Sequence, residues 1–246
     1  MTAAWNKDGV PKGSPSLESP GQRAACLQAA ALRANALGSQ KIPFVFLSSF
    51  EMDEVQVLTM DEAETFGLSF MLPGMETPFP LLEELIEAAR RPPLQEGFSL
   101  VNPVSQERYN RAFKAVQDAE RAGDAWLVNL CFPSQVESSY SLAELFTHAR
   151  APWKVYVRDR FASWSPECFI RIEDDRIRSW PMKGTIACPE TEAEAQRAAQ
   201  CLLEDPKERA EHTTIVDLIR NDLTRVSRNV QVHAFRELLR VHTGGG

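Results

Sequence analysis

Residues 205–226 read DPKERAEHTTIVDLIRNDLTRV, and this stretch predicts a long helix near the end of the chain. Asp205 is a residue type that caps helices, and Pro206 suits the first helical position because its fixed φ angle matches a helix start. Glu208 and Glu211 then lie one turn apart on the same helical face. The stretch therefore places two carboxylates side by side close to the start of a helix.

Start and stop signals mark four more helices upstream of this stretch. Ser141 and Thr191 are each followed three residues later by Glu, which is the capping-box pattern. Ser105 can cap a helix whose apolar residues repeat at helical spacing and which ends at Gly123. The predicted helices span about 81–90, 105–123, 141–150 and 191–203.

Apolar runs rich in β-branched and aromatic residues predict strands between the helices. The runs at 168–172 and 177–180 flank the acidic turn Glu173-Asp174-Asp175, and they predict a hairpin within a β-meander. Because strands outnumber helices and the two alternate irregularly, the sequence predicts an α+β fold. The other predicted strands span 44–47, 55–60, 66–72, 126–132 and 153–157.

The first 40 residues differ in composition from the rest of the chain. Glycine and proline punctuate the polar residues 1–22, which is typical of a flexible segment. The Ala-rich residues 23–37 favour a short surface helix. We therefore expect residues 1–40 to be a flexible leader and residues 41–246 to form the folded domain.

Composition and charge exclude several classes of protein. Of 246 residues, 43% are hydrophobic and 25% are charged, which is typical of a globular chain, and no apolar run is long enough to span a membrane. The 27 Lys and Arg against 34 Asp and Glu give a net charge of −7, which disfavours nucleic acid as a partner. The five cysteines include no CxxC pair, so reduced thiols in a cytoplasmic protein are expected.

Lys183 and Glu167 are the first candidates for chemistry. Lys183 lies between a predicted strand and Gly184, so its amine can face a pocket as an anion clamp or, when desolvated, as a nucleophile. If the strands at 168–172 and 177–180 pair, Glu167 lies at the same open end of the hairpin, where its carboxyl can act as an acid. The alternatives are a solvated surface lysine and a weak salt bridge at the rim.

Glu208 and Glu211 are the candidate metal ligands. Two carboxylates one helical turn apart suit a hard cation such as Mg²⁺, which takes its remaining ligands from water and substrate oxygens. From spacing alone, a solvated helix face with Glu208 as a capping residue is the better interpretation. The neighbouring His212 is either a packing residue or a further polar group of the site.

Four short motifs follow one another along the chain: NLCFP at 129–133, SPE at 165–167, PMKGT at 181–185 and EHTTIVDLIRNDL at 211–223. With these motifs the chain resembles the chorismate-utilising enzymes, and within them the aminodeoxychorismate synthase branch, over about residues 41–246. The Val-Asp-Leu-Ile-Arg-Asn-Asp-Leu run is the most specific part of the resemblance. The family fold implies an α+β architecture of two packed antiparallel sheets, a β-sandwich, with helices outside.

The resemblance implies roles for the candidate residues. Lys183 is implied as the group that attacks the chorismate ring, and Glu167 as the acid near the leaving hydroxyl. Gly184 and Thr185 are implied to line the substrate carboxylate. A lysine favours the aminodeoxychorismate branch, because anthranilate-forming relatives have a small residue there. The implied reaction joins chorismate to ammonia from a separate glutamine amidotransferase subunit, and gives 4-amino-4-deoxychorismate for 4-aminobenzoate and folate synthesis.

The same resemblance implies Mg²⁺ as cofactor, with Glu211 as a ligand and Glu208 as its helper. Four further residues match family positions, and we expect them to have structural roles beneath the site: Asp217, Arg220, Asn221 and Asp222. The family continues past Gly246 with a further metal-binding glutamate and closing strands, so we expect only the N-terminal portion of a chorismate-binding domain, inactive as a synthase alone. The alternatives are another chorismate-utilising enzyme, such as anthranilate or isochorismate synthase, and a non-catalytic fragment.

Overall fold

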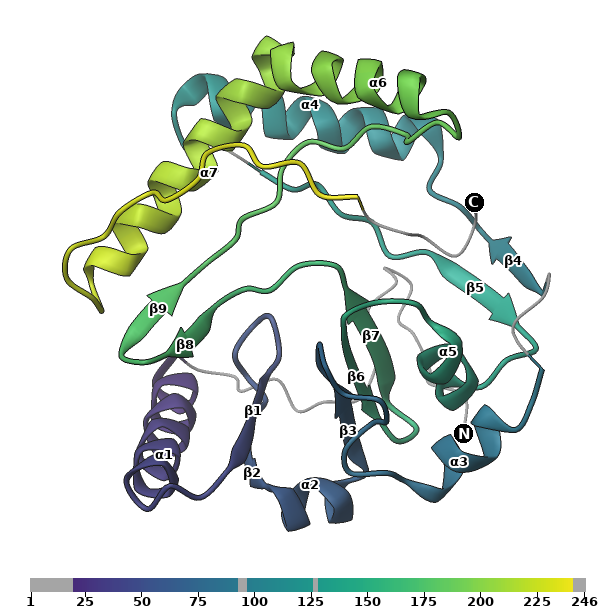
Figure 1. Ribbon diagram of the computed structural model, residues 1–246, viewed down its shortest axis with the longest axis vertical. Helices are drawn as coiled ribbons and strands as arrows, with labels where there is room; N and C mark the ends of the chain where they lie inside the picture. Colours follow the sequence, from purple (N-terminus) through teal and green to yellow (C-terminus); the bar gives the residue numbers. More distant parts are fainter. Residues whose placement is uncertain (1–19, 93–96, 126–127, 241–246) are drawn as a thin grey trace. The chain divides into compact units, whose positions relative to one another are not determined.

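The protein divides into two compact units, which a computed structural model describes for residues 20–92, 97–125 and 128–240 (Figure 1). The first unit comprises residues 1–101, 135–148 and 154–163, and the second comprises residues 102–134, 149–153 and 164–246. Each unit contains helices and antiparallel strands, so the predicted α+β class is confirmed.

Three small sheets form the frame of the first unit (Figure 1). β1 (Phe44–Ser48) pairs with β2 (Val55–Thr59), and β4 (Phe98–Val101) pairs with β5 (Gln135–Ser138), both antiparallel. In the third sheet β6 (Trp153–Val157) lies between β3 (Leu68–Met71) and β7 (Phe161–Ser165). The helices of this unit are α1 (Pro20–Ser39), α2 (Met60–Phe66), α3 (Glu83–Ala89) and α5 (Leu142–His148).

The buried core of the described residues lies almost entirely in the first unit. One hydrophobic cluster contains Phe146 and Tyr156, whose rings lie 5.7 Å apart between centroids. A second cluster contains Leu68 and Val157, which face each other across the paired strands β3 and β6. In the described part of the second unit, Ala195 is the one buried hydrophobic residue, so that unit has a much thinner core.

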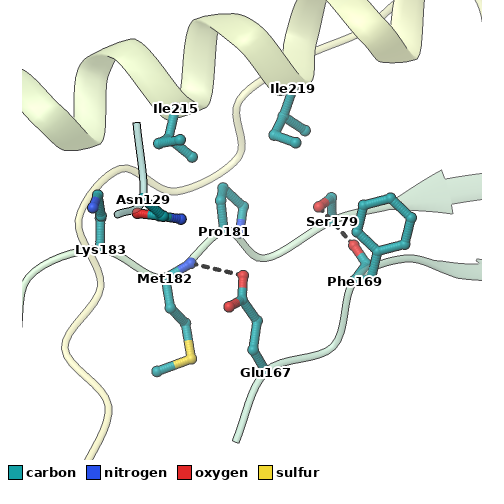
Figure 2. Close-up of a pocket in the computed structure, with 9 residues that line it drawn as sticks. All are labelled: Asn129, Glu167, Phe169, Ser179, Pro181, Met182, Lys183, Ile215 and Ile219. Atoms are coloured by element: carbon teal, nitrogen blue, oxygen red, sulfur yellow. Dashed lines mark hydrogen bonds between the residues drawn. The ribbon is translucent and has the colours of Figure 1, made fainter. Parts of the chain in front are cut away.

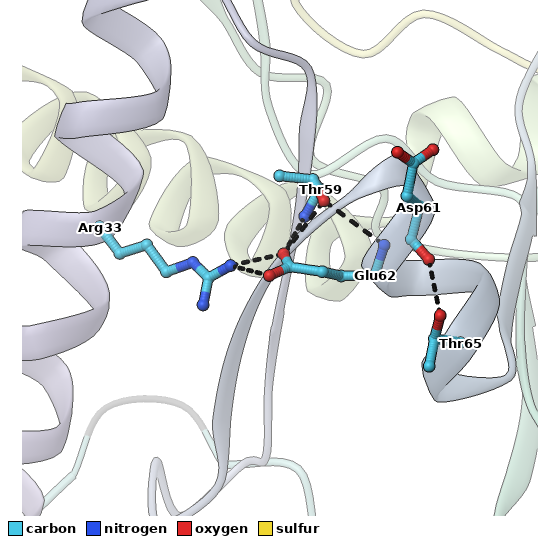
Figure 3. A network of polar contacts seen from close by, with 5 residues as sticks. All are labelled: Arg33, Thr59, Asp61, Glu62 and Thr65. Atoms are coloured by element: carbon cyan, nitrogen blue, oxygen red, sulfur yellow. Dashed lines mark hydrogen bonds and ion pairs between the residues drawn. The ribbon is translucent and has the colours of Figure 1, made fainter.

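A polar network joins α1 to the start of α2 (Figure 3). The Glu62 carboxylate accepts the backbone N–H of Thr59 at 2.8 Å, and the Thr59 hydroxyl accepts the N–H of Glu62, which completes a capping box. Arg33 of α1 forms an ion pair with the same carboxylate. The Thr59 N–H first, and then Arg33, lower the pKa of Glu62. Residues 20–39 of the predicted leader thus form an anchored helix, whereas residues 1–19 lie outside the described residues.

Side-chain caps begin the described helices of the second unit at the predicted places. Ser105, Thr191 and Asp205 each accept the backbone N–H of the residue three positions on, which satisfies one of the unpaired donors at a helix start. These capped helices are α4 (Gln106–Ala122), α6 (Glu192–Glu204) and α7 (Pro206–Thr224).

No helix in the described part of the chain is long and apolar enough to cross a membrane.

The predicted hairpin at the acidic turn is confirmed, although its strands are shorter than predicted. β8 (Arg171–Glu173) pairs antiparallel with β9 (Arg176–Arg178). Asp174 and Asp175 connect them with φ angles of 49° and 58°. Two consecutive residues in the left-handed region make the tight turn that matches the twist of a hairpin.

The strand predicted at 126–132 is wrong for its described part. Residues 128–132 are irregular, and residues 126–127 lie outside the described ranges. Phe132 packs against Tyr109 of α4, with 5.9 Å between ring centroids. The apolar character of this run therefore reflects packing on a helix, not a place in a sheet.

The elements that the sequence analysis missed are short, and they include α2, which was not predicted although Thr59 and Glu62 have the capping-box spacing. The strand predicted at 55–60 ends at Thr59, because the Thr59–Glu62 capping box starts α2 there. β4 and β5 pair although their side chains are largely exposed, so no burial pattern marks them. The described strands form four sheets of two or three strands each, and the two-sheet sandwich stays a prediction.

Truncating the buried ring of Phe146 is expected to destabilise the first unit. Phe146→Ala removes a side chain with no exposed surface, and should lower the free energy of unfolding by about 3–5 kcal/mol. Phe50→Ala removes the same atoms from a side chain that is 96% exposed, and should change it by less than about 0.5 kcal/mol. Urea unfolding followed by circular dichroism measures both, and equal losses would contradict the assigned core.

The capping box at the start of α5 is expected to make the first unit acid-labile. The N–H of Ser141 first, then its hydroxyl and Arg91, lower the pKa of Glu144 from 4.5 to about 2. Because the folded-state value is depressed, this stabilisation is complete above the unfolded-state pKa and is lost as the pH falls from about 4.5 to about 2. Glu144→Gln should remove that part of the pH dependence in urea unfolding between pH 5 and 2. Glu76→Gln, at an exposed position, should retain it.

Candidate functional site

The second unit contains a pocket of about 270 Å³ at the open end of the β8–β9 hairpin (Figure 2). Four segments converge on it: the residues before β8, the residues after β9, one face of α7 and the irregular segment that contains Asn129. The lining residues are Asn129, Glu167, Phe169, Ser179, Pro181, Met182, Lys183, Ile215 and Ile219.

Hydrogen bonds past the paired residues of β8 and β9 hold the Glu167 carboxyl close to Lys183. The Ser179 hydroxyl donates to the carbonyl of Phe169 at 2.8 Å, which keeps the two segments together past the last strand pair. Glu167 then accepts the backbone N–H of Met182 through Oε1 at 3.1 Å, as Figure 2 shows. The N–H of Glu167 donates to the Ser165 hydroxyl at 3.0 Å. The carboxyl of Glu167 is thereby held against the backbone of Met182, the residue before Lys183.

Lys183 lies between the pocket and the first half of α7. Its amine points to the side on which α7 lies (Figure 2), and Nζ is 3.3 Å from Glu211 Oε2. Its side chain is 26% exposed. Ile215 and Ile219, one helical turn apart on α7, give the pocket an apolar wall. The lysine can therefore reach a molecule in the pocket while it also contacts a carboxylate of the helix.

The turn at Gly184 requires glycine for two reasons. Its φ of +78° lies in the left-handed region, which side chains other than glycine rarely adopt. A Cβ at this position would also lie 2.7 Å from Glu208 Oε2 and 3.3 Å from Leu202 Cδ1. The backbone of the turn thus packs directly on the first turn of α7. Thr185, next in the chain, is exposed and does not line the pocket.

Two lysines neutralise the acidic pair on α7. Lys207 Nζ lies 3.1 Å from Glu208 Oε1 and 3.2 Å from Glu211 Oε1. Lys207 first, and then Lys183, lower the pKa of Glu211, and both glutamates, Glu208 first, raise the pKa of Lys207. Within the described ranges, no group of three or more His, Cys, Asp or Glu side chains is placed to hold a metal. A cation here would have two protein carboxylates.

His212 is a packing residue and not a further polar group of the site. Its ring meets that of Phe235 edge-on, with 5.2 Å between centroids. Burial first, and then the charge of Arg236, lower its pKa. Arg236 in turn donates to the carbonyls of Leu202 and Leu203 at the end of α6. The segment after α7 is thus bound back to α6 and α7.

The structure brings most of the predicted site residues together. Glu167 and Lys183 line one pocket, Glu211 contacts Lys183, and Glu208 contacts the Gly184 turn. Thr185 stands apart from the lining. Asp217 and Arg220, expected to pack beneath the site, are exposed and pair with each other at 3.2 Å, and Asn221 and Asp222 are exposed as well.

Two site residues were missed by the sequence prediction. Asn129 lies in one of the quoted motifs and lines the pocket, but an amide in a run expected to be a strand gave no chemical signal. Lys207 stands one residue before Glu208 and four before Glu211, and the second of these spacings places two helical residues on one face. From this spacing the sequence could have indicated that Lys207 contacts the glutamates of α7.

Comparison with known proteins identifies the family of this chain. A family model described as chorismate binding enzyme matches residues 23–243. The chain belongs to the chorismate binding enzyme family. The match begins within α1 and takes in every residue of the pocket, so the helix anchored by Arg33 is part of the family domain.

Relatives of this chorismate binding chain carry several names. An uncharacterized PabA-like protein of Pasteurella multocida is 37% identical over 87% of the chain and 62% of its own length. Aminodeoxychorismate synthase component 1 of Escherichia coli is 33% identical over 54% of the chain and 32% of its own length. Anthranilate synthase component 1 of Aeropyrum pernix is 37% identical over 61% of the chain and 37% of its own length.

The matched relatives are longer than this chain. The chain spans 62% and 61% of the length of the PabA-like proteins of Pasteurella multocida and Haemophilus influenzae. No solved structure matches the chain. The family membership therefore rests on sequence, and the site geometry rests on the structure described above.

Replacing Gly184 is expected to strain the turn and to move Glu208. Gly184→Ala should lower the free energy of unfolding by about 1–2 kcal/mol because of its positive φ angle. The flexible Glu208 carboxylate should rotate away from the new methyl group, and so leave Lys207.

Gly123→Ala is the matched control, because Gly123 has a φ of +85° and a Cβ there would meet no described atom within 4 Å. It should show the same loss in urea unfolding without any movement of Glu208 in a crystal structure of the variant. An unmoved Glu208 in Gly184→Ala would contradict the close contact.

Proposed function

We propose that the pocket at the end of the β8–β9 hairpin binds chorismate, and that the whole protein joins ammonia to it to form 4-amino-4-deoxychorismate. The observation that carries this proposal is that an amine and a carboxyl, those of Lys183 and Glu167, line one cavity of about 270 Å³. Family membership supports chorismate as the substrate class. The lysine supports the aminodeoxychorismate branch, through the resemblance described above.

In the proposed reaction Lys183 supplies the nucleophile. The ammonium group first leaves Glu211 and loses a proton to solvent. The neutral amine then bonds to a ring carbon of chorismate, the ring double bonds shift, and the C–O bond to the hydroxyl breaks. Protonated Glu167 gives the proton with which the hydroxyl leaves as water. Ammonia then bonds to the carbon that lost the hydroxyl, the double bonds shift back, and the bond to Lys183 breaks. One proton of the incoming ammonia returns to Glu167.

We propose Glu211 and Glu208 as the residues that hold Mg²⁺. The donor set fits, because one oxygen of each carboxylate already converges on a single cationic group, Lys207 Nζ, at 3.2 and 3.1 Å. Mg²⁺ commonly takes one or two protein carboxylates and completes its shell with water and substrate oxygens. When bound, the ion would neutralise negative charge on a carboxylate of chorismate.

The ammonia source and the complete fold are further parts of the proposal. We propose that a separate glutamine amidotransferase subunit supplies the ammonia, because the four motifs resemble the synthase component of such an enzyme. The small antiparallel sheets are proposed to be parts of the two-sheet sandwich of the family.

A second candidate is another chorismate-utilising reaction, such as anthranilate formation. The 37% identity with anthranilate synthase component 1 of Aeropyrum pernix favours it. Separation of the products distinguishes the two, because anthranilate is aromatic and 4-amino-4-deoxychorismate retains the non-aromatic ring and side chain.

Removing the amine of Lys183 is expected to abolish amination without abolishing binding. Lys183→Ala should lower the rate of 4-amino-4-deoxychorismate formation at least about 100-fold in the whole protein, supplied with chorismate, Mg²⁺ and excess ammonium salt. Calorimetric titration of this chain with chorismate should give a dissociation constant within about threefold of the parent, since ring contacts remain.

Lys114→Ala serves as the control, because Lys114 lies on α4 and pairs only with acids outside the pocket in the contacts described, at 2.9 Å from Asp118. It should keep the parental rate. A near-parental rate in Lys183→Ala would refute the nucleophile, and anthranilate as the product would favour the second candidate. Absence of chorismate binding by the parent chain would refute the assigned pocket.

A further inference from the structure

Lys207 sits where helix energetics disfavour a lysine. It is the second residue of α7, directly after Pro206, and the positive end of a helix dipole repels a cation there. A lysine four residues before a glutamate is also the less stabilising order of such a pair. A stabilising effect on α7 therefore does not account for a lysine at position 207. The contacts of Lys207 with Glu208 and Glu211 do account for it.

The two acids that Lys207 contacts present their oxygens in a matched way. Glu208 Oε1 and Glu211 Oε1 both face Lys207 Nζ, at 3.1 and 3.2 Å. Glu211 Oε2 faces Lys183 Nζ at 3.3 Å, and Glu208 Oε2 faces the Gly184 turn. One oxygen of each carboxylate thus converges on a single point, and the ammonium group of Lys207 occupies it.

Exposure gives Lys207 freedom that the acids lack. Its side chain is 73% exposed, whereas those of Glu208 and Glu211 are 22% and 26% exposed. An exposed lysine holds such a pair weakly, because water and salt compete for its charge. The ammonium group can therefore leave the acids at small cost, while the acids stay in place.

We infer that Lys207 is a built-in competitor for the divalent cation: its ammonium group occupies the point at which the cation binds, and swings into solvent when the cation arrives. The inference rests on the proposed function, in which Glu211 and Glu208 hold Mg²⁺. It adds that Lys207 sets the affinity of the site, so that Mg²⁺ binds more weakly than two bare carboxylates would allow.

Titration of the full chain with Mn²⁺, followed by electron paramagnetic resonance, tests the inference without any enzyme activity. Lys207→Met keeps the length of the side chain and removes its charge, and should tighten Mn²⁺ binding about three- to tenfold. Lys207→Arg should keep the parental affinity. Lys114→Met removes an equal charge from an i, i+4 pair on α4 and should leave Mn²⁺ binding unchanged.

Glu211→Gln separates failure of the inference from failure of the proposed cation site. It should weaken Mn²⁺ binding at least about tenfold, because it removes one of two charged ligands. If it does so while Lys207→Met binds like the parent or more weakly, the role of Lys207 is refuted and the site stands. If Glu211→Gln binds like the parent, or neither the parent nor Lys207→Met binds, the site and the inference are both refuted.

A thermal measurement gives an independent readout. Without divalent salt, Lys207→Met should melt close to the parent, because the exposed pairs of Lys207 contribute little to stability and Lys183 still neutralises Glu211. Added Mg²⁺ should raise its melting temperature more than that of the parent, since a tighter ligand stabilises the folded state more. An equal Mg²⁺ response in both proteins would overturn the inference.

Discussion

The close approach of the Gly184 turn to the side chain of Glu208 is the contact on which the site depends. It is possible only because residue 184 has no Cβ, which would lie 2.7 Å from the carboxylate. With the backbone this near to α7, Lys183 reaches Glu211, and the segment after β9 closes one side of the pocket. A single glycine thereby couples the proposed nucleophile to the proposed cation site.

The hairpin supplies the second constraint on the site. Its tight turn at Asp174 and Asp175 fixes the register of β8 and β9, and the Ser179 contact extends that register toward the pocket. Since side chains in paired segments alternate sides, a fixed register decides which residues face α7. Glu167 and Lys183 lie sixteen residues apart along the chain, yet this register makes them lining residues of one cavity.

Local chemistry in the sequence predicted most of the helices and the hairpin, whereas long-range packing decided elements that no local pattern marks. Capping residues such as Ser105 and Asp205 act within three residues, so their helices were predictable. Phe132 lies in an apolar run that packs on α4, and no local pattern separates that from a strand. The roles of Lys183 and Glu167 came from a family resemblance, whereas the contacts of Lys207 came from the structure.

The thin core of the second unit has a consequence for its motions. With Ala195 as its one described buried hydrophobic residue, few apolar contacts resist local opening there. Amide protons of α7 should therefore exchange with deuterium sooner than those of the paired strands β3 and β6, which bury Leu68 and Val157. A ligand that bridges the hairpin and α7 would suppress this exchange, because it would have to dissociate before the unit could open.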